Sequence, residues 1–200
     1  MAKDNIHAKH RDRLRQQFLD GEENALNDIQ LLEMLLFYAI PRKDTNPIAH
    51  RLMSEYGSLS GVLDAAYEDI LDVEGIGEIS AALLKTVPEI ARRYMLDKMG
   101  AKPKLTTIET AGEYVSNLFI GHTKEVLYML CLDGRCALSR CVKLYEGTLD
   151  EVAVYPRTVV QQALKYNAKS IILAHNHPSG SLRPSVNDIK VTEDILAALN

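Results

Sequence analysis

The chain has 200 residues, of which 46% are hydrophobic and 25% are charged, and its formal net charge is −4. This length allows one large domain or two small ones, and the composition is typical of a soluble globular protein. No segment has the strongly basic balance of a typical nucleic-acid-binding protein. The apolar runs are too short to span a bilayer, and the charged residues 1–18 lack the apolar core of a signal peptide. We therefore expect a cytoplasmic protein without a membrane partner.

The first hundred residues have the pattern of an all-helical domain, which we predict over residues 1–98. Residues 29–40 form an apolar run that Asn27 or Asp28 could cap and that Pro41 ends, so a core helix is expected there. Further helices, separated by short turns, are expected over 45–57, around 60–67 and in two pieces over 68–95.

The segment "LDVEGIGEISAALLK", residues 71–85, resembles a helix-hairpin-helix motif. In that motif Gly75 and Gly77 would let backbone N–H groups approach a DNA phosphate at a helix N-terminus. Lys85 is the only base nearby in the sequence, whereas one glutamate precedes the turn and another follows it. Gly75, Gly77 and Lys85 are therefore candidate DNA contacts. The alternatives are a protein-binding role and glycines that only permit a tight turn between helices.

Residues 98–106 are a candidate linker, with Gly100, Pro103 and three lysines. Beyond this linker the pattern changes to strands mixed with helices, which predicts an α/β or α+β second domain over residues 104–200. We expect strands over 125–132, 136–147 and 170–175, a hairpin turn at 133–134, and helices over 107–120, 156–168 and 184–200.

Two histidines follow an apolar strand in "LAHNHPSG", residues 173–180. Side chains two residues apart on a strand point to the same face, so His175 and His177 could bind one metal ion. Asp188 would open the next helix after a turn-rich segment and could face back towards them. Two imidazoles and one carboxylate leave one position of a tetrahedral zinc ion open, as in catalytic sites. The alternative is a histidine bound by backbone and an aspartate that only stabilises a helix start.

Two more residues complete the candidate site. Glu125, which opens the strand over 125–132, is the best-placed acid in the second half to transfer a proton. Ser185 has the spacing of a capping box with Asp188 and could donate a hydrogen bond to a developing oxyanion.

The stretch "HNHPSGSLRPSVND", residues 175–188, resembles the JAMM motif of MPN-type metalloproteases: Glu, then His-x-His-Pro, then Ser-x-x-Asp. Glu125 fits the glutamate of that motif. Together with the segment over 146–164 and the helical first half, the chain from about residue 5 to 200 resembles the RadC family, also called UPF0758. The resemblance implies an α+β protein: a helical region followed by an MPN/JAMM-like α/β domain of the cytidine-deaminase-like kind.

The same resemblance implies one zinc ion (Zn²⁺) per chain, bound by His175, His177 and Asp188. Glu125 would be the general acid/base and Ser185 would assist the oxyanion. The implied activity is zinc-dependent hydrolysis of a peptide or isopeptide bond in an unknown protein or peptide substrate. Two alternatives stay open: a DNA-associated repair or recombination accessory protein, and a non-catalytic MPN scaffold.

The sequence departs from the family pattern at two places. Asn176 stands between the histidines where many JAMM proteases have Ser or Thr, which could alter substrate contacts. The sequence ends at Asn200, inside the helix expected to carry Asp188, whereas family members usually continue through further strands. A second domain truncated at its C-terminus is therefore expected.

Overall fold

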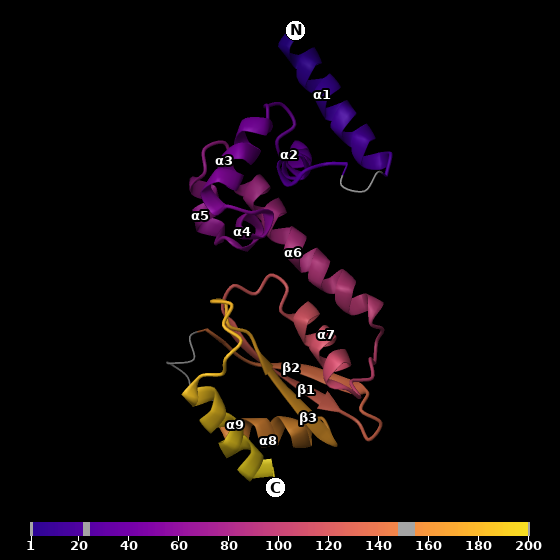
Figure 1. Ribbon diagram of the computed structural model, residues 1–200, viewed down its shortest axis with the longest axis vertical. Helices are drawn as coiled ribbons and strands as arrows, with labels where there is room; N and C mark the ends of the chain where they lie inside the picture. The colour runs from indigo at the N-terminus through magenta and orange to yellow at the C-terminus, as the bar shows by residue number, and fades with distance from the viewer. Residues whose placement is uncertain (1, 22–24, 148–154, 200) are drawn as a thin grey trace. The chain divides into compact units, whose positions relative to one another are not determined.

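The computed structural model describes residues 2–21, 25–147 and 155–199 (Figure 1). Its contacts divide the chain into two compact units, Met1–Ile90 and Ala91–Asn200. The division falls inside α6 (Glu78–Lys98), and Leu96 near the end of this helix packs against a core of the second unit. The domain limits at residues 98 and 104 stay a prediction. Asn200 and residues 148–154 of the 146–164 segment lie outside the described residues.

The first unit is helical, as its sequence predicts. A fully buried cluster that includes Leu32, Leu52, Ile70 and Leu84 forms its main core. Asn27 caps α2, because its side chain accepts a hydrogen bond from the N–H of Gln30, and the side chain of Gln30 accepts one from the N–H of Asn27. Besides the first part of α6, the helices of this unit are α1 (Ala2–Leu19), α2 (Asp28–Ala39), α3 (Asn46–Tyr56), α4 (Leu59–Asp64) and α5 (Tyr67–Asp72).

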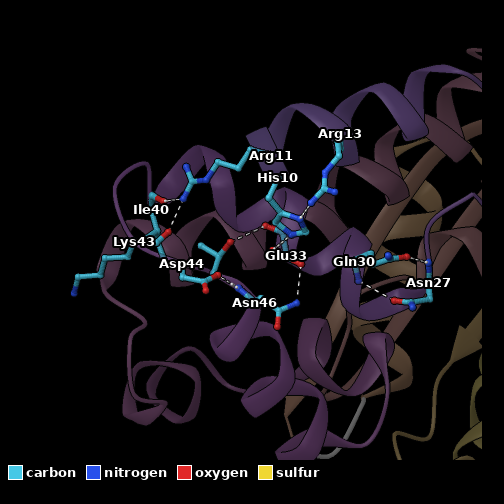
Figure 2. Close-up of polar contacts among 11 residues, drawn as sticks. His10, Arg11, Arg13, Asn27, Gln30, Glu33, Ile40, Lys43, Asp44 and Asn46 are labelled. Carbon is cyan, nitrogen blue, oxygen red and sulfur yellow. Dashed lines mark hydrogen bonds and ion pairs between the residues drawn. The ribbon is translucent and has the colours of Figure 1, made fainter. Parts of the chain in front are cut away.

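A polar cluster ties α1 to α2 and α3 (Figure 2). The carboxylate of Glu33 is only 1% exposed, and its oxygens lie 2.9 Å from Nε2 of His10 and 2.9 Å from Nδ2 of Asn46. Arg11 donates hydrogen bonds to the carbonyl oxygens of Ile40 and Pro41, both at 2.8 Å. A side chain of α1 thus binds the backbone directly after the C-terminus of α2.

The second unit contains a three-stranded sheet of order β2–β1–β3, in which both pairs of neighbours are antiparallel. The predicted strands over 125–132 and 170–175 are confirmed as β1 and β3, whereas β2 begins at Leu138 because Cys136 adopts a positive φ of 55° in the hairpin. The elements are α7 (Ile108–Leu118), β1 (Glu125–Leu132), β2 (Leu138–Gly147), α8 (Pro156–Lys165), β3 (Ser170–His175) and α9 (Val186–Leu199).

Both faces of this sheet are covered (Figure 1). On one face Leu130 packs in a core with α7, and on the other Met129 packs with Val159 of α8 and Ile195 of α9. The central strand β1 is therefore buried along nearly its whole length. The fold is α+β, as the sequence predicts. Within the described ranges, no helix has the length and apolar character needed to cross a membrane.

Candidate metal centre

The structure brings the three predicted ligands together at the end of β3. His175 is the last residue of this strand and lies opposite Leu127 of β1. Its Nε2 atom is 3.0 Å from Nε2 of His177 and 3.4 Å from Oδ2 of Asp188, which is itself 3.5 Å from Nε2 of His177. Within the described part of the chain, no other group of three His, Cys, Asp or Glu side chains could hold a metal ion.

The turn after β3 orients His177. Its carbonyl oxygen accepts the N–H of Gly180 at 2.9 Å, and Gly180 has a φ of 76°, which glycine adopts without strain. Nδ1 of His177 lies 2.8 Å from the carbonyl oxygen of Ser181. Because a carbonyl can only accept, Nδ1 donates this hydrogen bond, and Nε2 is the ring nitrogen directed at the cluster. Such a bond from the second ring nitrogen is the usual support of a histidine metal ligand.

Asp188 is held by the capping box that the sequence predicts. Its Oδ2 accepts the N–H of Ser185 at 2.6 Å, and its own N–H donates to Oγ of Ser185 at 3.1 Å. Partial burial would raise the pKa of Asp188, but hydrogen bonds from the side chain and backbone of Ser185, together with His175 and His177, lower it below its usual range. The carboxylate is therefore ionised and oriented before any metal ion arrives.

The spacing of the three donor atoms fits a tetrahedral metal ion. Bonds of 2.0–2.2 Å to nitrogen and oxygen place neighbouring donors about 3.3–3.6 Å apart. The observed separations run from 3.0 to 3.5 Å. Imidazole and carboxylate donors suit several divalent transition metals, so the geometry indicates a metal site without selecting the metal.

The ligands border two recesses. A cavity of about 530 Å³ has His175 and Asp188 in its wall, and mostly apolar side chains, including Leu173 and Ile195, line the rest. A second recess of about 350 Å³ is lined by His175, His177 and the loop after them. Molecules from solution can therefore approach the three ligands, as a site with an open coordination position requires.

Glu125 is not one of the three clustered ligands, but the sheet places it on their side. It opens β1, two residues before Leu127, and so shares a face with Leu127. Directly opposed residues of antiparallel strands also share a face, and Leu127 is opposed to His175. Glu125 and His175 therefore project from the same face of the sheet.

The sequence did not reveal the structural role of Asn176. Its side-chain amide is hydrogen-bonded to the backbone of β1: it accepts from the N–H of Val126 and donates to the carbonyl oxygen of Lys124. A polar residue between two metal ligands was the only signal, and it does not reveal a partner fifty residues away.

The two glycines of the helix-hairpin-helix-like turn have roles within the helical unit. Gly75 has a φ of 98°, and a Cβ atom there would lie 2.9 Å from the side chain of Ile48. The N–H of Gly77 donates to Oγ of Ser80 at 2.9 Å. That N–H is thus already bonded within the turn, which favours the alternative of a tight turn between helices.

The positive charges near this turn are also engaged. Lys85 donates to the carbonyl oxygens of Leu63 and Ala65 at 2.7 and 2.8 Å, and burial lowers its pKa. The sequence left Lys85 as the only base near the turn, but the fold brings Arg51 to the turn as well, where its Nε donates to the carbonyl of Glu74 at 3.2 Å. DNA contact through Gly75, Gly77 and Lys85 stays a prediction.

Comparison with known proteins agrees with this fold. Residues 105–200 match the family model of the RadC-like JAB domain, so the second unit carries a JAB domain. The chain is 37% identical to a UPF0758 protein of Paraburkholderia xenovorans strain LB400, over 92% of this chain and 73% of the relative. It is 38% identical to one of Burkholderia mallei strain SAVP1, over 94% and 68%. The chain therefore belongs to the RadC (UPF0758) family. The names of these relatives state no activity.

Proposed function

We propose that this RadC-family protein is a zinc-dependent hydrolase of the JAMM type that cleaves a peptide or isopeptide bond. The observation that carries the proposal is the cluster of His175, His177 and Asp188, whose donor atoms lie 3.0–3.5 Å apart beside two recesses. Three protein ligands are the number typical of catalytic zinc, whereas structural zinc sites are closed by four. The nature of the bond rests on the resemblance of residues 175–188 and Glu125 to the JAMM motif.

The zinc site, Glu125 and Ser185 have separate roles in the proposed hydrolysis. A bound zinc ion would polarise the substrate carbonyl and lower the pKa of a water molecule towards neutrality. Glu125, on the same sheet face as His175, takes the proton from the attacking water and passes it to the leaving amine. The Ser185 hydroxyl, at the start of α9, donates to the developing oxyanion.

The first test measures zinc per chain by metal mass spectrometry, in the wild type and in Asp188→Ala. The second measures cleavage of quenched fluorescent peptides, including branched isopeptides, by zinc-loaded protein. We expect about one zinc ion in the wild type, loss of zinc in Asp188→Ala, and cleavage by the wild type. Glu125→Gln should keep zinc and lose cleavage. Glu113→Gln, the same change at an exposed position of α7, is the matched control and should keep both.

Two results would overturn the proposal. Wild-type protein that holds no zinc after zinc is supplied would leave the non-catalytic scaffold as the better description. Cleavage that Glu125→Gln performs as fast as the wild type would show that this carboxylate is not the proton carrier.

A further inference from the structure

We infer that Asn176 is a positioning residue that holds the backbone of Glu125 beside the metal centre, an inference that rests on the proposed function. Oδ1 of Asn176 accepts the N–H of Val126 at 2.8 Å, and Nδ2 donates to the carbonyl oxygen of Lys124 at 3.0 Å. These two backbone groups belong to the peptide bonds directly before and after Glu125. One side-chain amide therefore brackets the residue proposed to carry the proton.

The amide stands where the strand ladder stops. Backbone pairing between β1 and β3 ends at Leu127 and His175, because the chain turns away after the first histidine. A side-chain amide has one acceptor oxygen and two donor hydrogens, so it can replace a peptide group of a neighbouring strand. Asn176 thus continues the pairing of β1 beyond the end of β3, at the residue between the two imidazole ligands.

This placement couples the ligands to the acid. Asn176 lies between His175 and His177 in the chain and is joined to each by a peptide bond. The same residue fixes the backbone on both sides of Glu125. A shift of the Glu125 backbone relative to the metal centre would have to break at least one of the two hydrogen bonds. Catalytic groups need such support because small errors in position lower the rate strongly.

The chemistry selects asparagine among similar side chains. Aspartate keeps the acceptor for the N–H of Val126 but loses the donor for the carbonyl of Lys124. Alanine loses both bonds. Both variants should therefore weaken the hold on the Glu125 backbone, because the aspartate carboxylate would face the carbonyl oxygen of Lys124 with no hydrogen between them. Asn176→Asp guards against a failure of Asn176→Ala to fold.

The deciding experiment is carbon NMR of protein labelled with ¹³C at the glutamate carboxyl groups, recorded without and with zinc. The Glu125 resonance is assigned by its loss in Glu125→Gln. In the wild type, zinc should shift this resonance. Asn176→Ala should still bind one zinc ion per chain, but the zinc-induced shift of Glu125 should fall to less than about half because its carboxylate no longer keeps one position beside the metal centre. Amide exchange at Val126 should become faster.

The matched control is Ser139→Ala. Ser139 also bonds the backbone of β1 through its side chain, donating to the carbonyl oxygen of Cys131 at 2.9 Å, but at the opposite end of the strand. This variant should leave the Glu125 resonance as in the wild type. With a peptide that the wild type cleaves, Asn176→Ala should lower kcat about 10–100-fold, with little change of KM. The acid side of its pH–rate profile should also move.

The outcomes separate this inference from the proposed function. Equal zinc-induced shifts in Asn176→Ala and the wild type would overturn the positioning role, as would loss of zinc from Asn176→Ala. No zinc-induced shift in the wild type would overturn both. A zinc-loaded wild type that shifts the Glu125 resonance but cleaves no peptide would overturn the proposed hydrolase alone, and the resonance in Asn176→Ala would still decide the role of Asn176.

Discussion

Ser185 and Asp188 cap each other at the start of α9: Oδ2 of Asp188 accepts the N–H of Ser185 at 2.6 Å, and Oγ of Ser185 accepts the N–H of Asp188 at 3.1 Å. The same Oδ2 lies 3.4 Å from Nε2 of His175. A single carboxylate oxygen therefore takes part both in the helix cap and in the metal cluster. This dual use makes the start of α9 part of the site.

We predict that Ser185→Ala weakens both the helix and the metal site. Loss of the cap should lower the free energy of unfolding by about 1 kcal/mol. Zinc affinity should fall about 10–100-fold, because Oγ of Ser185 no longer fixes the backbone N–H of the ligand Asp188. Chemical denaturation and zinc titration against a competing chelator measure the two effects. Ser185→Thr keeps the hydroxyl and should bind zinc nearly as the wild type; equal affinity in Ser185→Ala would contradict the prediction.

The two glycines of the turn before α6 should respond differently to alanine. Gly75→Ala should cost about 1–3 kcal/mol, because alanine at a φ of 98° is strained and its Cβ would meet Ile48 at 2.9 Å. Gly77→Ala should cost at most about 1 kcal/mol, since nothing lies within 4 Å of its added Cβ and φ is not positive. Urea unfolding of both variants gives the comparison. A larger loss in Gly77→Ala would show that the turn differs from this description.

The buried carboxylate of Glu33 should make Asn46→Ala costly. Removal of Nδ2 of Asn46 deprives a carboxylate that is 1% exposed of a donor at 2.9 Å. We expect the free energy of unfolding to fall by about 1–3 kcal/mol. Asn187→Ala, at an exposed position of α9, is the control and should change it by less than about 0.5 kcal/mol. Similar losses in the two variants, measured by urea unfolding, would argue against the polar cluster of Figure 2 as a stabilising feature.

Asp133 should make the β1–β2 hairpin sensitive to acid. Hydrogen bonds from the N–H groups of Ala137 and Arg135, at 3.0 and 2.8 Å, lower the pKa of Asp133. A lowered pKa in the folded protein means that ionised Asp133 adds stability above its unfolded pKa of about 3.9. That contribution is lost as the pH falls through the lower, folded pKa.

The measurement compares urea unfolding of the wild type and Asp133→Asn from pH 7 down to pH 2.5. Asparagine keeps an acceptor oxygen but does not titrate. The wild type should be the more stable protein at pH 7, and the difference should disappear at the acid end. A difference that stays constant over this range would show that ionisation of Asp133 does not stabilise the turn.

Much of the local structure was determined by the sequence alone. The bounds of β1 and β3 follow from short apolar runs between turn residues, and the start of α2 follows from Asn27, whose cap depends on a partner three residues away. The candidate ligands His175, His177 and Asp188 follow from the kinds of residue and their spacing. These features depend on contacts within one element or one turn, which a sequence pattern records directly.

Only the tertiary structure decided how distant groups meet. The position of β1 between β2 and β3 sets Leu127 opposite His175, so Glu125 projects from the same face of the sheet as His175. Asn176 is hydrogen-bonded to the backbone of β1, and Lys85 donates hydrogen bonds to two carbonyl groups. These bonds join residues 20 or more positions apart. Strand order, register and burial select such partners, and all three are set only when the cores pack. A polar group that becomes buried must then bond to the acceptor or donor that the fold places beside it.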